Sequence, residues 1–107
     1  MTTQELTGIV TYLERIALPP AAEVRVALVD AGRRVLAEQV QALGERQVPV
    51  PFAIAYVAEI DEYSIYALRA EIHVEGRLAF VSPFDVLVLT GGNPSSDVEL
   101  RVRPPSP

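Results

Sequence analysis

The chain has 107 residues, a formal net charge of −5 at pH 7 and no cysteine, and half of its residues are hydrophobic. We expect one domain over residues 1–107, with enough apolar side chains for a core that needs no disulfide. Nucleic-acid binding is not expected, because the neutralisation of phosphates requires a basic patch and the basic residues are spread thinly. The lack of cysteine excludes a thiolate metal site, a cysteine nucleophile and a thioether lipid anchor from this sequence.

Membrane insertion is not expected either. The sequence has no run of about 18 apolar residues, which a transmembrane helix requires. Residues 1–5 are polar and do not have the positively charged start and apolar stretch of a signal peptide. Two locations therefore stay open: the cytoplasm, or the cell envelope (periplasm) if a leader has been removed.

The first half of the chain alternates apolar and polar residues, which is typical of strands with one buried face. In the second of these strands, residues 24, 26 and 28 are expected to face inward, and Asp30-Ala31-Gly32 then predicts a turn. The predicted strands span residues 6–13, 23–29, 34–41 and 48–57.

The segment 34–41 is compatible with two structures. As a strand, it places Leu36 and Val40 on one side, with Val35 and Ala37 on the other. A helix over residues 34–44 is the alternative, because Ala, Leu, Glu and Gln are good helix formers.

Two prolines indicate a sheet edge in the segment 48–57. Pro49 and Pro51 lie two residues apart, so they remove two N–H donors from the same lateral side of the strand. The edge is either blunted against aggregation, which we favour, or a docking edge for a partner strand.

Residues 58–62 predict one helical turn, and Tyr66 follows it at the start of a strand. We expect Tyr66 to form a tyrosine corner, with its ring inward and its hydroxyl bonded to upstream backbone. Residues 65–82 then predict an antiparallel hairpin. A three-residue turn, Val74-Glu75-Gly76, pairs Ile72 with Leu78 and keeps apolar residues on one face, with Gly76 in the left-handed conformation.

The remaining residues predict two short strands and a tail. The strands cover residues 85–90 and 98–103, and a loop joins them. Residues 104–107 form a proline-rich extended tail. The whole pattern predicts an all-β protein: a single antiparallel β-sandwich of about seven or eight strands, immunoglobulin-like or transthyretin-like.

Few residues suggest chemistry. The sequence has one histidine and no nucleophile motif or phosphate loop, so we expect no enzyme and no cofactor. Glu71, His73 and Glu75 project from one strand face and are weak candidates for a metal site. Strand neighbours of this kind are about 6.5–7 Å apart and do not converge on a point, so a solvated outer face is favoured and no metal is expected.

Several segments resemble the YbaY/YscW-type lipoprotein family, also described as type III secretion system lipoprotein chaperones. The resemblance extends over about residues 6–103. It is carried by residues 8–12 (GIVTY), 14–20 (ERIALPP), 26–30 (VALVD), 51–56 (PFAIAY), 66–70 (YALRA), 76–80 (GRLAF) and 88–92 (VLTGG).

The resemblance implies a compact β-sandwich and a non-enzymatic role. The better understood members are pilotins, which help outer-membrane secretins to localise and assemble. The chain is then expected to be a binding or assembly module for a protein or peptide segment, here without the lipid anchor. The alternative is a structural or oligomerisation domain that forms a homodimer and has no small-molecule ligand. A metal-dependent hydrolase is the third and weakest interpretation.

Overall fold

In the computed structural model, which describes residues 4–56 and 60–106, the chain is built from β-strands. The described residues contain eight strands and no helix, which confirms the predicted all-β class. The strands are β1 Gln4–Thr11, β2 Glu23–Asp30, β3 Val35–Ala42, β4 Val50–Tyr56, β5 Tyr66–Val74, β6 Arg77–Val81, β7 Val86–Val88 and β8 Val98–Arg101.

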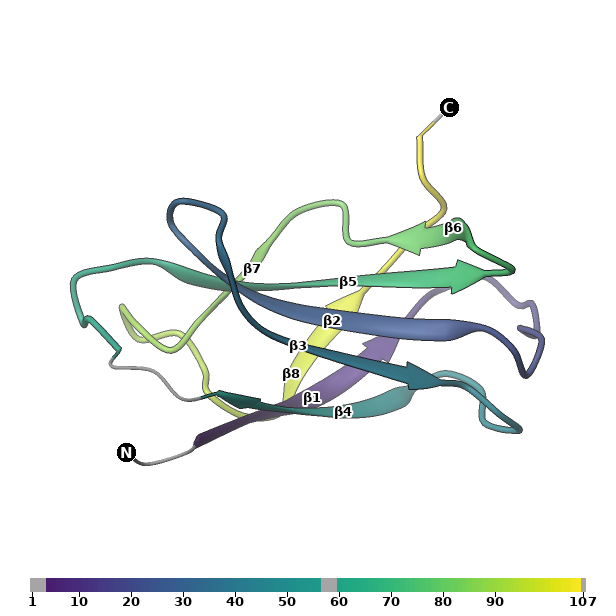
Figure 1. Cartoon of the computed structure of the whole chain (residues 1–107), viewed down its shortest axis with the longest axis horizontal. Helices are drawn as coiled ribbons and strands as arrows, with labels where there is room; N and C mark the ends of the chain where they lie inside the picture. The colour runs from purple at the N-terminus through teal and green to yellow at the C-terminus, as the bar shows by residue number, and fades with distance from the viewer. Residues whose placement is uncertain (1–3, 57–59, 107) are drawn as a thin grey trace.

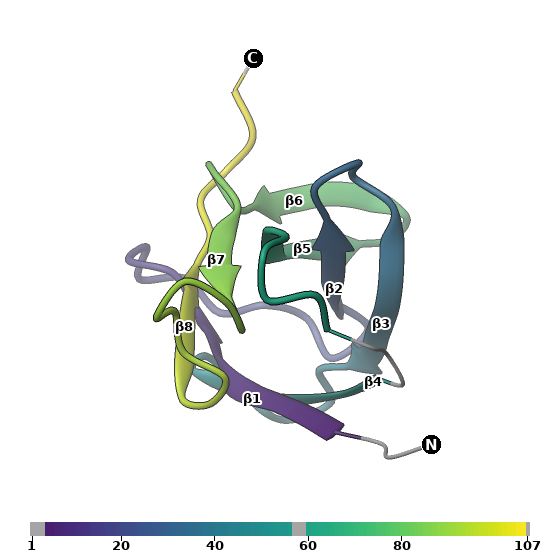
Figure 2. The same cartoon turned by 90° about the vertical axis from the view of Figure 1, so that its left-hand side faces the viewer.

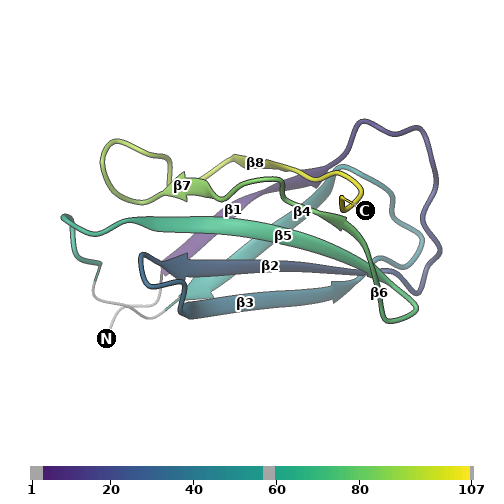
Figure 3. The same cartoon turned by 90° about the horizontal axis from the view of Figure 1, so that it is seen from above.

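The strands form two sheets that pack face to face (Figure 1). Sheet A has three strands in the order β4-β1-β8. Sheet B has five: the order is β3-β2-β5-β6, and β7 pairs with the part of β5 that β6 leaves free. The strands of the two sheets cross obliquely, as Figure 3 shows. The β1–β8 pair is parallel, which departs from the predicted antiparallel sandwich, whereas the other strand pairs are antiparallel.

The core lies between the sheets (Figure 2). In β2, Val24, Val26 and Leu28 are fully buried, as the alternation predicts. Leu6 and Val10 of β1 are fully buried in the facing sheet. Burial of an aliphatic side chain of this size stabilises a fold by about 1.5–3 kcal/mol, so these residues hold the two sheets together.

Strand β3 confirms that this segment is a strand and not the alternative helix. The alternation of inward-facing and outward-facing side chains along β3 is interrupted, however. Leu28 pairs with Ala37 and Val29 pairs with Val35, so Leu36 is the extra residue of a β-bulge. The bulge reverses the faces that follow it. Val35 and Val40 are consequently both exposed, and the prediction that they face opposite sides is wrong.

The β5–β6 turn has two residues, and the predicted three-residue turn is wrong. Val74 pairs with Arg77, which leaves Glu75 and Gly76 as the turn. Their φ angles are 52° and 79°. Two successive positive φ angles are typical of a type I′ turn, whose twist matches that of the flanking strands.

A β-bulge makes this tight turn compatible with an apolar inner face. Ile72 pairs with Phe80 and His73 pairs with Leu78, so Ala79 is an extra residue in β6. The bulge lets Leu78 face outward beside His73 while Phe80 faces the core, where it is buried. The predicted pairing of Ile72 with Leu78 assumed an unbroken ladder and is therefore wrong.

Strand β4 lies at the edge of sheet A, as the prolines predict. Pro51 is within β4, whereas Pro49 precedes its first residue. Side chains from β3 cover the free edge: Gln41 Nε2 donates to the Pro51 carbonyl at 3.0 Å, and the Ala53 N–H donates to Gln39 Oε1 at 3.4 Å. The edge is thereby blunted, which is the favoured of the two alternatives.

The structure describes only part of the predicted helical turn and part of the predicted tail. The helical turn expected at residues 58–62 lies partly outside the described residues, and its described end is a turn in which the Ser64 N–H donates to the Asp61 carbonyl. Residues 104–106 of the predicted tail are exposed and belong to no strand, and Pro107 lies outside the described residues. Among the residues described, no helix is long and apolar enough to cross a membrane.

Candidate functional site

An apolar groove lies where the edges of the two sheets meet. Its volume is about 250 Å³, and most of its wall is apolar. We call it the Leu13–Phe84 groove after its two most exposed apolar side chains, each 72% exposed. The lining residues are Leu13, Glu14, Pro83, Phe84, Arg101, Val102 and Arg103.

Backbone hydrogen bonds bring the three separate segments of this groove together. The Val102 N–H donates to the Thr11 carbonyl at 2.9 Å, which places the chain after β8 beside the end of β1. Val81 and Arg103 exchange two backbone bonds, of 2.8 and 3.0 Å, which tie the end of β6 to the same chain. The groove is thus built on rigid strand ends, although its exposed apolar side chains come from loops.

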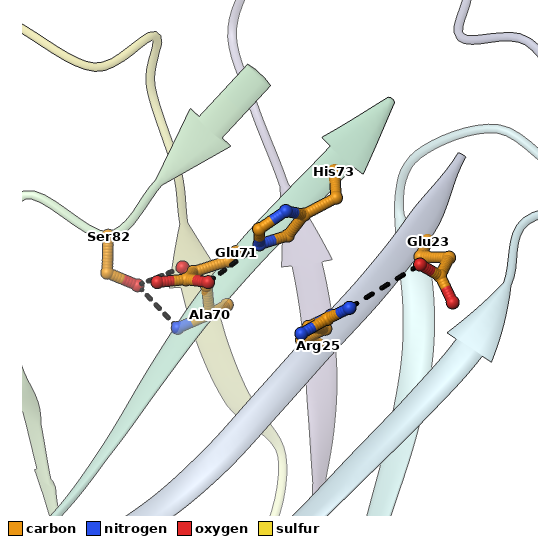
Figure 4. Close-up of polar contacts among 6 residues, drawn as sticks. All are labelled: Glu23, Arg25, Ala70, Glu71, His73 and Ser82. Atoms are coloured by element: carbon orange, nitrogen blue, oxygen red, sulfur yellow. Dashed lines mark hydrogen bonds and ion pairs between the residues drawn. The ribbon is translucent and has the colours of Figure 1, made fainter. Parts of the chain in front are cut away.

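Phe84 is exposed because β6 ends at Val81 and Pro83 cannot continue the ladder. Ser82 bonds to β5 at the break. Its Oγ accepts from the Ala70 N–H at 2.8 Å (Figure 4). Its own N–H donates to the Ala70 carbonyl at 2.9 Å. The chain then leaves the sheet until β7 begins at Val86. Phe84 lies in this loop, outside both sheets, so its side chain is exposed to solvent.

Tyr12 fixes the loop that carries Leu13. Its ring is buried and stacks on Phe80 with the ring centroids 4.5 Å apart, and its hydroxyl donates to the Ile16 carbonyl at 2.7 Å. Burial, and to a smaller extent the Glu14 carboxylate, raises the pKa of the Tyr12 phenol. Because Tyr12 faces inward, its neighbour Leu13 faces solvent.

The weak metal candidates do not all come together. His73 Nε2 lies 2.8 Å from Glu71 Oε1 on β5, whereas Glu75 lies in the exposed turn (Figure 4 shows the first two). Within the part of the chain that the structure describes, no group of three or more His, Asp or Glu side chains could hold a metal ion.

The sequence predicts structural roles for four residues: Tyr66, Gly76, Pro49 and Pro51. Tyr66 is buried, and its hydroxyl accepts a hydrogen bond from the Asp61 N–H, five residues upstream, at 3.0 Å. This is the contact expected of a tyrosine corner. Gly76 has the left-handed φ of the turn, while Pro51 and Pro49 lie in and before the edge strand.

Sequence reasoning missed the groove. The apolar pattern predicts that Leu13 belongs to the first strand, but β1 ends at Thr11 and Leu13 is in the following loop. The pattern predicts no role for Phe84. The available signal was the pair Ser82-Pro83, which interrupts an apolar run just before an aromatic residue.

Comparison with known proteins identifies the family. A family model described as "Type III secretion system lipoprotein chaperone (YscW)" matches residues 1–100. The chain belongs to the YscW family. This confirms the family resemblance that the sequence segments indicated.

A solved structure agrees with membership of the YscW family. It is described as an alternative pilotin from the type II secretion system of Vibrio cholerae, and its TM-score with this chain is 0.87 at 33% sequence identity. The alignment covers 95% of this chain and 98% of that one. No curated protein matches the chain. Both descriptions concern chaperone or pilotin roles, which supports a non-catalytic protein that acts on a protein partner.

Proposed function

We propose that the chain is a pilotin-like chaperone that binds an apolar segment of an outer-membrane secretin in the Leu13–Phe84 groove. The observation that carries the proposal is the pairing of two largely exposed apolar side chains with a concave, mostly apolar wall. Exposed apolar surface of this kind is typical of protein-interaction sites. The chaperone description of the family and the pilotin description of the Vibrio cholerae protein support a protein partner that belongs to a secretion system.

The chemistry of the groove favours a peptide over a small reactive substrate. Leu13 and Phe84 offer apolar contact, while Arg101 and Arg103 offer charged donors at the rim. Guanidinium groups bind carboxylate and carbonyl oxygens well. An apolar segment with a carboxylate close to it therefore matches the groove best.

The proposed role also places the protein in the cell envelope. Secretins are assembled at the outer membrane, so a chaperone that binds them must reach the same compartment. Binding of the partner in the Leu13–Phe84 groove does not depend on a lipid anchor.

A binding measurement with matched variants tests the proposal. A fluorescent peptide from the C-terminus of the cognate secretin is titrated with the wild type, with Leu13→Asp and with Phe84→Asp. Each variant removes apolar contact and adds a charge beside the peptide, so a loss of about tenfold or more in affinity is expected. Tyr63→Asp, at a side chain that is 90% exposed and outside the groove, is the control. Equal affinities for all four proteins would contradict the assignment of the groove.

A further inference from the structure

The outer face of sheet B has more exposed apolar surface than a solvated sheet needs. Nine large hydrophobic residues are exposed among those described, and five of them are on or beside this face. Clustered exposed apolar side chains are typical of interaction surfaces. The five residues are Val35, Val40, Ile65, Leu78 and Leu87.

The pairing register arranges this face in rows that run across the strands. One row is wholly apolar: Val35 of β3 pairs with Val29 of β2, which pairs with Ala67 of β5, which pairs with Leu87 of β7. We call it the apolar row.

Two further rows have polar side chains at the centre and apolar residues at the sides. In the Arg25 row, Arg25 pairs with Glu71, and Val40 and Val81 flank them. In the Glu23 row, Glu23 pairs with His73, and Ala42 and Leu78 flank them. Figure 4 shows the four central side chains on the neighbouring strands β2 and β5.

We propose that this face binds the same face of a second copy, about a two-fold axis that runs parallel to the strands between β2 and β5. This rotation places β2 of one copy over β5 of the other, and β3 over β6 and β7. A two-fold contact uses the same patch on both copies, so the patch must be complementary to itself. Each of the three rows must therefore be complementary to itself under the rotation.

The polar centre of the face, which lies on β2 and β5, is complementary to itself under this rotation. The rotation places Arg25 over Glu71 of the second copy and Glu23 over His73 of the second copy, and each contact occurs twice. Within one copy, among the residues that the structure describes, the ion pairs of these side chains join residues of the same strand: Arg25 Nη2 lies 3.5 Å from Glu23 Oε1, and Glu71 Oε1 lies 2.8 Å from His73 Nε2. The Arg25 side chain is 41% exposed, so its outer guanidinium nitrogens can donate to a second copy.

The apolar residues at the two sides of the face, on β3 and on β6 and β7, also face one another under this rotation. Val40 faces Val81 of the second copy, Ala42 faces Leu78, and Val35 faces Leu87. The central pair of the apolar row, Val29 and Ala67, is already buried within one copy, at 2% and 5% exposure, so the contact in this row comes from Val35 and Leu87 at its ends.

The row between the apolar row and the Arg25 row also fits. It contains Glu38, Ala27 and Arg69, which pair across β3, β2 and β5. A hollow of about 60 Å³ lies over Ala27, with the carboxylates of Glu38 and Glu71 and the guanidinium groups of Arg25 and Arg69 in its wall. The rotation places Arg69 of the second copy over Ala27, beside both carboxylates.

A two-fold axis perpendicular to the strands fits less well. It would place Val29 over Glu23 of the second copy and Ala67 over His73, leaving charged groups against apolar ones without partners. The unpaired burial of charge is costly. The pattern therefore selects the axis parallel to the strands.

The size of the face predicts a weak dimer. Four strands about 4.8 Å apart and eight residues long cover roughly 500 Å² on each copy, or about 1,000 Å² in total. This area is at the low end for specific interfaces. We expect a dissociation constant in the micromolar range rather than a permanent dimer.

Sedimentation equilibrium with two charge variants tests the dimer. The wild type is expected to dimerise below about 1 mM. Arg25→Glu alone and Glu71→Arg alone each create two like-charge contacts, so each should weaken self-association by about tenfold or more. A mixture of the two variants restores both Arg–Glu contacts, so it should associate about as tightly as the wild type.

The single variants distinguish contact through this face from a general effect of net charge, because Glu71→Arg makes the net charge of −5 two units less negative and would then tighten self-association rather than weaken it. The mixture distinguishes it from misfolding, which mixing would not rescue. Phe84→Asp, in the Leu13–Phe84 groove, should leave dimerisation unchanged. A wild type that stays monomeric to about 1 mM would overturn the proposal, and so would a mixture no tighter than either variant alone.

Discussion

Gly8 shows how one residue permits the pairing on which sheet A depends. A Cβ built at Gly8 overlaps the Val98 carbonyl oxygen of the neighbouring strand β8 and lies 2.8 Å from the Phe52 ring. Main-chain atoms of a paired strand cannot move aside without breaking the ladder. The absence of a side chain at Gly8 therefore allows β8 to approach β1 closely.

Gly8→Ala is expected to destabilise the protein by about 1–3 kcal/mol, because it forces an atom into a packed interior. Urea unfolding, followed by circular dichroism, measures the change. Gly32→Ala is the matched control, since its Cβ would meet Asp30 at an ordinary 3.5 Å. Equal losses in the two variants would show that the close approach at Gly8 does not limit stability.

Tyr12 and Tyr56 give the protein a sensitivity to alkali. Burial raises the pKa of both phenols, with a further contribution from Glu14 at Tyr12. The folded state therefore favours the neutral phenol. The stability that this contributes is fully present below the ordinary pKa of 10.0 and is lost as the pH rises through the raised value.

Tyr12→Phe should consequently lose less stability than the wild type between about pH 9 and pH 11. At neutral pH it should be about 1 kcal/mol less stable, because the Ile16 carbonyl loses its donor. Urea unfolding at several pH values measures both effects. Tyr63→Phe, at the most exposed tyrosine, serves as the control and should follow the wild type. A parallel alkaline loss in Tyr12→Phe and wild type would refute the role of the buried Tyr12 phenol.

Among the strands, alternation predicted the buried faces well and failed at β-bulges. The buried face of β2 followed from apolar spacing alone. In β3 and β6, one extra residue in each strand changed the side that faced the core, at Leu36 and Ala79. A bulge depends on which residue of the partner strand is opposite, and this is not encoded within either strand by itself.

The β5–β6 turn can be tested by its backbone preference. Glu75 has a φ of 52°, which asparagine adopts more readily, and Gly76 has a φ of 79°. Glu75→Asn should raise the unfolding free energy by about 0.5 kcal/mol, whereas Gly76→Ala should lower it by about 1 kcal/mol. Thermal unfolding of the two variants should therefore shift in opposite directions. Shifts of the same sign would contradict a type I′ turn.

The covered edge of β4 gives a second prediction for a strand. Gln39→Ala combined with Gln41→Ala removes the side-chain bonds to Ala53 and Pro51. We expect a loss of about 1–2 kcal/mol in stability and faster aggregation, because the freed strand edge can pair with another chain. Urea unfolding and light scattering measure the two effects. Glu45→Ala, at an exposed loop residue, is the control; a double variant as soluble and stable as this control would show that the glutamines do not protect the edge.

For the whole molecule, the sequence predicted the fold class and the family, but it did not predict the candidate site. The alternating apolar residues determine two layers, and those can be inferred from local spacing. The Leu13–Phe84 groove exists because Thr11 bonds to Val102 and Val81 bonds to Arg103, across more than 20 residues of sequence. The rows on sheet B likewise depend on strand pairing. Surfaces made by long-range contacts become visible only when the register is known.

Binding of a secretin segment in the Leu13–Phe84 groove is tested most sharply by a nuclear magnetic resonance titration of the ¹⁵N-labelled chain with the secretin peptide. We predict that the largest shift changes occur at Leu13, Glu14, Phe84 and Arg101, and that the outer face of sheet B changes little. Changes concentrated on β2, β3 and β5, or the absence of any change at saturating peptide, would contradict binding in the groove.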